Sequence, residues 1–228
     1  MAQLVTPEEV LKAQGSASTT RLVICVAVVF LHGMMCGASL GYGGLVLPHH
    51  LDPESSSGLL NLDQGQASWF NSVTPVGMCL GVLASIPASE RLGRKKMFLI
   101  SNVVSCLGFV CIYLAPSYLF LVAFRIGQCF GLGLGATTTA VFLTEVGIVR
   151  LRGPVSGCNM TSFCFGLLCY TAISPLVPVS LLAIVLALHC LVVFLLILVL
   201  LPDSPQWLVR RGKEEDARAA LKRLRGSR

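Results

Sequence analysis

Residues 153–202 contain no Asp, Glu, Lys or Arg and read GPVSGCNMTSFCFGLLCYTAISPLVPVSLLAIVLALHCLVVFLLILVLLP. A helix that crosses a bilayer needs about 20 predominantly apolar residues. A stretch of 50 residues therefore has room for two such helices. The segment Ser174-Pro175-Leu176-Val177-Pro178 interrupts it near the middle. We expect helices at roughly 155–174 and 180–201.

Four further charge-free gaps lie upstream, and each is long enough for one spanning helix. They run from Arg21 to Asp52, from Asp63 to Glu90, from Lys96 to Arg125 and from Arg125 to Glu145. Pro116-Ser117 marks a turn between the last two. We expect helices at roughly 22–47, 68–89, 97–115 and 118–142, which makes six in all.

The composition agrees with this count. The chain has 228 residues, of which 54% are apolar and 12% are charged. A soluble domain carries about 25% charged residues, and a disordered chain is rich in charge and poor in apolar residues. Both classes are excluded. We predict an all-α membrane protein with a tail at 1–20, a six-helix transmembrane bundle at 21–208 and the start of a linker at 209–228.

The basic residues predict the orientation of this bundle. Of the 17 Lys and Arg, 16 lie in the N-terminal tail, the 91–96 loop, the 150–152 loop or the C-terminal tail. The 48–67 loop has three acids and no base. By the positive-inside bias, both termini are cytoplasmic. The net charge of +6 then reflects membrane topology, and we expect the lipid bilayer as a partner and no nucleic acid.

The 10 cysteines lie within the predicted helices, away from the outer loops where disulfides would form. The sequence has no Cys-x-x-Cys and no Cys/His cluster with the spacing of metal ligands. We expect small buried side chains at these positions, no metal site and no cofactor.

Residues Glu90–Lys96, ERLGRKK, connect the second and third helices. Membrane orientation alone would select a short basic loop here. Gly93 additionally permits a tight turn, and Glu90 places an acid beside the cations. An acid at one helix end and cations at the next can hold two helices together in one conformational state.

The fourth helix contains glycines every four residues, at Gly127, Gly131 and Gly135. This spacing predicts a smooth face on which another helix packs closely. A phosphate-binding loop would require a preceding strand and a water-facing turn, and neither is available inside an apolar span. Arg125 lies within the same helix. It either extends to the outer interface or has a structural or pathway role, and the sequence leaves both open.

Glu145 follows the fourth helix and precedes Arg150-Leu151-Arg152-Gly153. It either pairs with Arg152, reaches Arg94 on the earlier loop, or is an ordinary loop acid.

The sixth helix is followed by LPDSPQWL at 201–208. Pro202 and Pro205 end the helix, and Trp207 suits a membrane interface. Beyond it, Ala217, Ala220, Leu221 and Leu224 fall at i, i+3, i+4 and i+7. This spacing predicts an amphipathic cytoplasmic helix, with acidic residues near its N-terminus and basic residues near its C-terminus.

Together these motifs resemble the sugar porter family of the major facilitator superfamily. The family's inner-loop signature is matched by Glu90, Gly93, Arg94 and Lys95, its fourth-helix signature by Arg125 and Glu145, the following Arg-Gly by Arg152-Gly153, and its Pro-Glu-Ser-Pro-Arg-Trp-Leu by Pro202–Leu208. Leu47-Pro48 and Ser68-Trp69 look most similar to the insect facilitated trehalose transporter-like branch.

The resemblance implies the N-terminal half of a carrier, built from 3+3 inverted repeats, that works by alternating access in a plasma membrane. Such a carrier needs twelve helices, and Arg228 falls within the linker that would lead to the seventh. We expect a C-terminal six-helix bundle as the partner that is missing from this chain.

The resemblance also implies two groups of site residues. The expected pathway residues are His32, Gln128, Asn159, Met160 and Phe163. The inner gate and its charge cluster comprise Glu90, Arg91, Gly93, Arg94, Lys95, Glu145, Arg152 and Asp203. The chain departs from the family pattern at Ala140 and Phe142, at Gln206, and at Met160, where hexose carriers have a sugar-binding Gln. A thioether cannot replace the donor and acceptor of an amide.

Proton-driven sugar porters similar to this chain carry an Asp after Gly-Tyr in the first helix. Here Gly41-Tyr42 is followed by Gly43, and the first, second, third, fifth and sixth helices contain no carboxylate. His32 is the remaining candidate for a proton carrier, with simple packing or a polar pathway contact as the alternative. We therefore expect facilitated, uncoupled transport of a sugar, either a hexose or a trehalose-like disaccharide. The alternative is a non-transporting half-length or pseudo-transporter membrane protein that binds partners. The chain has no catalytic motif of the common hydrolases, so we do not expect an enzyme.

Overall fold

The structure is a computed structural model, and it describes residues 19–52, 59–146 and 152–225. Within these ranges the regular elements are all helical. The long helices are α2 (Thr19–Leu51), α3 (Gln64–Leu92), α4 (Arg94–Tyr113), α5 (Tyr118–Val146), α6 (Arg152–Ile173) and α7 (Leu182–Leu200). Two 3-10 turns, η2 (Ser174–Leu176) and η3 (Val179–Leu181), connect α6 to α7, and α8 (Pro205–Arg210) and α9 (Glu214–Arg225) follow.

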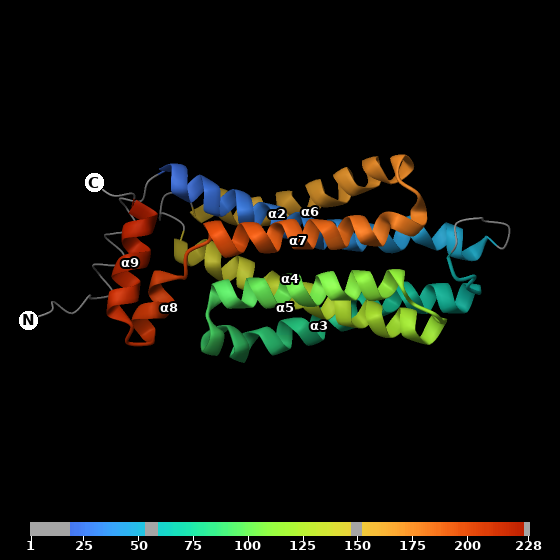
Figure 1. Cartoon of the computed structure of the whole chain (residues 1–228), viewed down its shortest axis with the longest axis horizontal. Helices are drawn as coiled ribbons and strands as arrows, with labels where there is room; N and C mark the ends of the chain where they lie inside the picture. The colour runs from blue at the N-terminus through green and yellow to red at the C-terminus, as the bar shows by residue number, and fades with distance from the viewer. Residues whose placement is uncertain (1–18, 53–58, 147–151, 226–228) are drawn as a thin grey trace, which may run out of the picture.

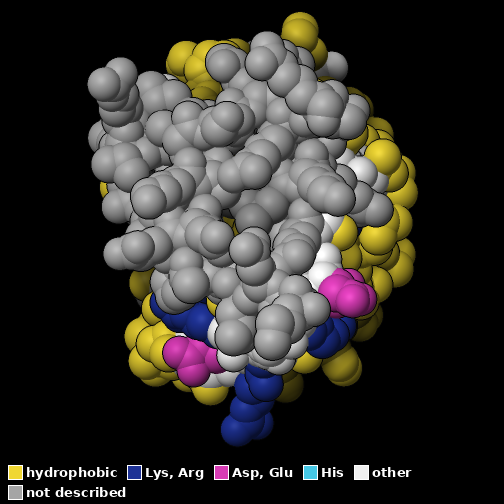
Figure 2. Space-filling model, turned by 90° about the vertical axis from the view of Figure 1, so that its left-hand side faces the viewer, with side chains coloured by type: hydrophobic (Ala, Val, Ile, Leu, Met, Phe, Trp, Pro, Cys, Tyr) yellow, Lys and Arg dark blue, Asp and Glu magenta, His cyan; other side chains and the backbone are white. Residues whose placement is uncertain are grey.

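The six long helices lie side by side along the long axis of the molecule, while α8 and α9 lie at one end of them (Figure 1). We call this the α9 end. Seen from there, hydrophobic side chains cover the flanks of the bundle, and basic and acidic side chains lie next to one another at the end itself (Figure 2). Apolar flanks with charges at an end are what a lipid-embedded bundle requires.

Five of the described helices are long and apolar enough to cross a membrane: α2, α3, α4, α5 and the α7 segment. The sixth, α6, has 22 residues, and at about 1.5 Å per residue this length also spans the hydrocarbon core. Its first side chains lie outside the described part of the chain. The predicted all-helical membrane bundle is confirmed.

The helices pair in a pattern that repeats itself. α3 packs most extensively against α5, α6 against α2, and α7 against α4, while α4 also packs extensively against α5, as its counterpart α7 packs, less extensively, against α2. In two inverted repeats, α2 corresponds to α5, α3 to α6 and α4 to α7. The contact of α3 with α5 then corresponds to the contact of α6 with α2, and the contact of α4 with α7 corresponds to itself. The packing therefore has the symmetry expected of 3+3 inverted repeats.

Local chemistry extends two helices beyond the ranges expected from the sequence. α3 begins at Gln64, four residues before the expected start, because Asp63 accepts a hydrogen bond from Gln66 N at 2.7 Å and Gln66 Oε1 accepts one from Asp63 N at 3.2 Å. This capping box satisfies two backbone groups that a helix end leaves open. α2 likewise continues through Pro48 to Leu51.

The predicted amphipathic helix is α9, and its apolar face contacts α8. Ala217 and Ala220 are buried together with Leu208, with Trp207 and Val209 packed against them. Ser204 caps α8 by accepting from Trp207 N, and Pro205 occupies its first turn. The two short helices thus form one unit at the α9 end.

Candidate functional site

Gly93 forms the turn between α3 and α4. Its φ of 88° lies in the left-handed region that favours glycine, and a Cβ there would lie 3.1 Å from two ring carbons of Trp207. The backbone angle would strain a residue with a side chain here, and the Trp207 ring would have to shift slightly to make room for its Cβ. The turn therefore brings α8 directly against the α3–α4 junction.

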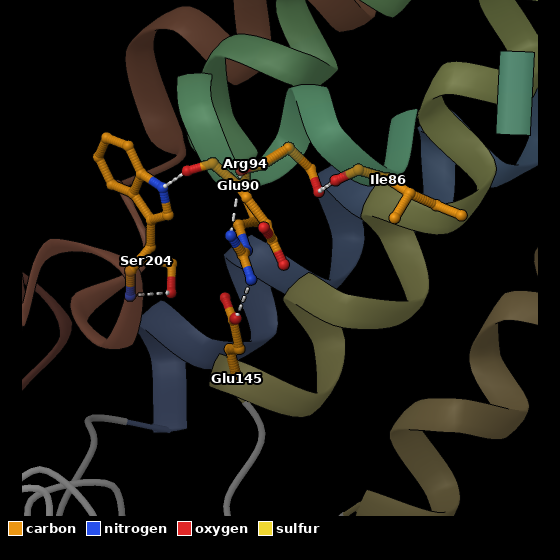
Figure 3. A network of polar contacts seen from close by, with 7 residues as sticks. Ile86, Glu90, Arg94, Glu145 and Ser204 are labelled. Carbon is orange, nitrogen blue, oxygen red and sulfur yellow. Dashed lines mark hydrogen bonds and ion pairs between the residues drawn. The ribbon is translucent and has the colours of Figure 1, made fainter. Parts of the chain in front are cut away.

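Arg94 and Glu145 form a buried ion pair beside this turn. Arg94 Nη2 lies 2.6 Å from Glu145 Oε1, and the two side chains are only 6% and 7% exposed. Arg94 Nη1 also donates to Ser89 O at 3.1 Å (Figure 3). The pair joins the start of α4 to the last turn of α5. Of the three roles considered for Glu145, the structure supports the contact with Arg94.

Trp207 and Arg211 form hydrogen bonds with the backbone of the α3–α4 turn. Trp207 Nε1 donates to Glu90 O at 2.8 Å, and Arg211 Nη2 donates to Glu90 O and Arg91 O, both at 3.1 Å. The Arg211 guanidinium also lies 6.0 Å from the centre of the Trp207 ring. Helix α8, the turn, Arg94 and α5 are therefore connected by consecutive contacts (Figure 3).

The remaining residues of the expected inner gate take different places. Glu90 and Arg91 have exposed side chains and contribute carbonyl oxygens, while Lys95 Nζ donates to Leu198 O at 3.0 Å. Asp203 is half-buried and forms no ion pair or hydrogen bond with a residue that the structure describes. Arg152 begins α6, but its side chain lies outside the described part of the chain.

Arg125 forms a second charged centre, inside the bundle. Its side chain is 1% exposed, so it does not extend to the outer interface and has a structural position in the core. Arg125 Nη1 donates to Gln128 Oε1 at 3.0 Å and Nη2 donates to Ser39 O at 2.9 Å. The guanidinium carbon lies 5.2 Å from the ring centre of Tyr42 and 5.4 Å from that of Phe70. These are neutral partners.

Two of the expected pathway residues are buried within the bundle. Gln128 is 0% exposed and donates to Ser39 Oγ at 3.0 Å. His32 is also 0% exposed, and its Nδ1 lies 3.2 Å from Asn102 Nδ2. A residue that lines a path between this bundle and a second one must be accessible when this bundle stands alone. Neither side chain is accessible in this structure, so the place of these two residues in the sugar path stays a prediction.

The other three pathway candidates lie on α6. Met160 is 71% exposed, and Asn159 and Phe163 are half-buried near the contact with α2. Their exposure is compatible with a path beside α6.

The predicted glycine face of α5 is corrected in part. Gly127 is exposed, and a Cβ there would meet nothing within 4 Å, because it lies on the outward side of the helix. A Cβ on Gly131 would lie 2.5 Å from Ser105 Oγ of α4, and one on Gly135 would collide with His32 of α2. Gly131 and Gly135 therefore lie in close helix contacts, and Gly127 lies in none with the part of the chain that the structure describes.

α2 and α6 form an equivalent close contact that was not predicted from the sequence. A Cβ on Gly37 would collide with Phe163 O, and one on Gly166 would collide with Met34 O. The signal was present, since Gly33, Gly37 and Gly41 also recur every four residues. Such spacing lets two helices approach at backbone distance.

The family model described as sugar (and other) transporter matches residues 8–228. The chain belongs to this family. Within the sugar transporter family, the chain is 31% identical to human "Solute carrier family 2, facilitated glucose transporter member 6", over 93% of this chain and 41% of that protein. It is 29% identical to Arabidopsis thaliana "Sugar transporter ERD6-like 6", over 92% of this chain and 42% of that protein.

The chain thus spans less than half the length of these relatives. Their names describe transporters, which agrees with the expectation that the protein is not an enzyme.

Solved structures confirm the fold. The proton:xylose symporter XylE, a major facilitator superfamily protein, superposes with a TM-score of 0.78 at 19% identity, over 91% of this chain and 50% of that one. A partially occluded inward open form of XylE from E. coli gives a TM-score of 0.72 at 18% identity. The sugar transporter family member described here therefore has the fold of half of a major facilitator transporter.

Proposed function

We propose that this chain is the N-terminal bundle of a facilitative sugar transporter that carries a hexose or a trehalose-like disaccharide. Transport would proceed by alternating access together with a second six-helix bundle. Family membership and the names of the relatives support a sugar as substrate. The match to about half of XylE supports a second bundle as partner. Leu47-Pro48 and Ser68-Trp69 favour the insect trehalose transporter-like branch.

The surroundings of Arg125 carry the proposal of uncoupled transport. Proton coupling requires a group that gains and loses a proton during the cycle. The polar groups that hold the Arg125 guanidinium in the described part of the chain are an amide and a backbone carbonyl. A Cβ on Gly43 would lie 3.6 Å from Arg125 Nη2. The position where an acid would face this arginine is therefore occupied by glycine.

The decisive measurement is sugar uptake into vesicles by a chain completed with a second bundle. Removing the proton gradient at a fixed sugar gradient should leave the initial rate unchanged. A collapse of uptake would show the proposal to be wrong.

A pair of glycine variants sharpens this test. Gly43→Asp should make uptake respond to the proton gradient, because the new carboxylate can reach Arg125 once the flexible Asn71 side chain moves aside. Gly44→Asp is the matched control, since a Cβ at Gly44 meets nothing within 4 Å. Equal responses from the two variants would contradict a special role for the Gly43 position.

We further propose that Asn159, Met160 and Phe163 of α6 line the sugar path. The Arg94–Glu145 ion pair, with Arg152 and Asp203, would form an inner gate at the α9 end that closes in the outward-facing state. If Arg152→Ala leaves both transport and conformational labelling unchanged, the gate assignment fails.

The proposal includes the membrane placement expected from the basic residues. Both termini would face the cytoplasm of the plasma membrane, with a tail at 1–20, the bundle at 21–208 and a linker beginning at 209. Protease access to terminal tags in intact and opened cells tests this orientation.

Comparing sugar flux through this 228-residue chain alone with flux through the completed chain tests the alternative of a non-transporting membrane protein. Flux by neither form, with intact partner binding, would favour that alternative.

A further inference from the structure

Arg125 is a buried cation without a counter-charge in the described part of the chain. Its side chain is 1% exposed, and an arginine in a protein stays protonated. The structure places no Asp or Glu that it describes within ion-pair distance of the guanidinium. The ring faces of Tyr42 and Phe70 attract the cation but carry no net charge. Because buried charges are normally paired, this arrangement calls for an anion.

One edge of the Arg125 guanidinium is available to such an anion. Nη1 donates to Gln128 Oε1 and Nη2 donates to Ser39 O, whereas the buried Nε donates to no residue that the structure describes. The guanidinium is planar, and Nε and Nη2 together form the edge that carboxylates usually bind. Only two of its five N–H groups are therefore used, and the unused Nε–H lies on that edge.

Gly43 of α2 lies beside the same guanidinium. A Cβ placed on Gly43 would lie 3.6 Å from Arg125 Nη2, so an atom at this place nearly touches the cation. That Cβ would collide with Asn71 Oδ1 of α3, which covers the place. The Asn71 side chain is exposed and can turn aside. Room for one small ion then opens next to Arg125, and the NH2 group of the Asn71 amide can donate to it.

The surroundings limit what this ion can be. The positive charge of Arg125 excludes a cation, and the groups available to a ligand are N–H donors, which suit an anion. The room beside Gly43 corresponds to about one side-chain atom, as the collision of a single Cβ shows. A carboxylate or a phosphate carries several heavy atoms and does not fit there. A monatomic anion does.

We propose that a chloride ion binds beside Gly43, between the Arg125 guanidinium and the Asn71 amide, and neutralises the buried arginine. Arg125 donates to it through its Nε–Nη2 edge, and Asn71 donates through its NH2 group. Helices α2, α3 and α5 of this chain supply the whole site. The proposal is independent of sugar transport, since it is measured by binding without flux.

The experiment is chloride binding to the full 228-residue chain in nanodiscs of zwitterionic lipid, with the large anion gluconate replacing chloride at constant ionic strength. The line width of the chlorine NMR signal reports the bound ion, and thermal unfolding reports its effect on stability. A ligand that binds only the folded state stabilises it by mass action. Chloride at tenfold its Kd should therefore raise the Tm by about 3 °C.

Three variants locate the ion. Arg125→Met should abolish both the line broadening and the Tm shift, because it removes the cation. Gly43→Asp should abolish both as well, because its carboxylate takes the place of the anion. Asn71→Ala should weaken chloride binding by about fivefold, the effect of losing one hydrogen bond.

Gly44→Asp is the matched control for Gly43→Asp. It adds the same charge one residue further on, where a Cβ meets nothing within 4 Å, and it should bind chloride as the unaltered chain does. Circular dichroism checks that every variant is folded. If Arg125→Met does not fold, the comparison of Gly43→Asp with Gly44→Asp decides.

The proposal is overturned if chloride neither broadens its signal nor stabilises the unaltered chain. It is also overturned if Gly43→Asp binds chloride normally, or if Gly44→Asp loses binding as fully as Gly43→Asp. Broadening that persists in folded Arg125→Met would show that the ion binds elsewhere, which contradicts the proposed site.

Discussion

Arg94 and Arg125 are both almost fully buried, yet their surroundings differ in kind. Arg94 lies at the α9 end and faces a carboxylate at 2.6 Å. Arg125 lies inside the bundle, where an amide, a backbone carbonyl and two aromatic rings surround it. The first arrangement contains two charges that depend on each other. The second contains one charge whose partners stay neutral.

The difference separates two consequences of burying an arginine. When one partner of a buried ion pair is lost, the other is left as an uncompensated charge, which costs far more than the pair contributes. When an arginine is held by neutral acceptors and ring faces, its removal leaves no charge behind. The Arg94 pair should therefore be sensitive to mutation of either partner, and the Arg125 centre should tolerate loss of its charge.

The largest expected effect follows from Glu145→Ala. It leaves Arg94 buried without its carboxylate and should lower the free energy of unfolding by about 3–5 kcal/mol. Unfolding by denaturant in detergent micelles measures it. Glu90→Ala is the control, because Glu90 has an exposed side chain and contributes only its carbonyl; its effect should stay within about 0.5 kcal/mol. Equal effects of the two variants would contradict the importance of the pair.

An intermediate loss of stability is expected from Arg125→Lys, which keeps the positive charge but removes the planar guanidinium group. Arg125→Lys retains a buried cation, which cannot donate to Gln128 and Ser39 through a planar fork. We expect a loss of about 2–3 kcal/mol, the contribution of a hydrogen bond to a charged group plus weaker contact with the rings. Thermal unfolding by circular dichroism provides the measurement.

Arg125→Met is the comparison variant for Arg125→Lys. It removes the charge while filling similar space, and Gln128 and Ser39 still pair with each other. We expect a change of no more than about 1 kcal/mol, since replacing a buried charge with an apolar side chain is often nearly neutral. If methionine destabilises the bundle more than lysine does, the contrast between the two arginines is wrong.

A small effect, that of one hydrogen bond, is expected from Trp207→Phe, which keeps a ring against Gly93 and deletes the N–H that donates to Glu90 O. The loss should be about 1 kcal/mol, and hydrogen exchange of the 89–94 backbone should increase. Trp69→Phe is the control, since Trp69 is 66% exposed at the start of α3. Unchanged exchange in Trp207→Phe would show that the ring alone positions the turn.

The sequence predicted the elements more accurately than the contacts. Gaps between charged residues located the long helices, because placing a charge inside hydrocarbon is costly and the positions of the charged residues can be read from the sequence alone. Gly93, Arg94 and Glu145 were expected near one another because the resemblance placed them in one charge cluster, and the structure joins Arg94 to Glu145.

Residue spacing could not predict which side of a helix faces which neighbour. Gly127, Gly131 and Gly135 have the same spacing, yet Gly127 lies on the outward side. Gln128 and His32 are polar and were expected beside the sugar path, and each forms a hydrogen bond within the bundle. Polarity indicates that a partner is needed and does not say whether that partner is a substrate or a neighbouring helix.

The sequence alone determined that this protein is a membrane-embedded helical bundle, because hydropathy and charge act residue by residue and need no knowledge of the fold. It also determined family membership through motifs that are local. Only the tertiary structure decided that Arg125 lacks a carboxylate in its described surroundings, that α8 holds the α3–α4 turn, and that Gly43 lies beside the Arg125 guanidinium. These properties depend on distances between residues far apart in the chain, and helix packing fixes those distances.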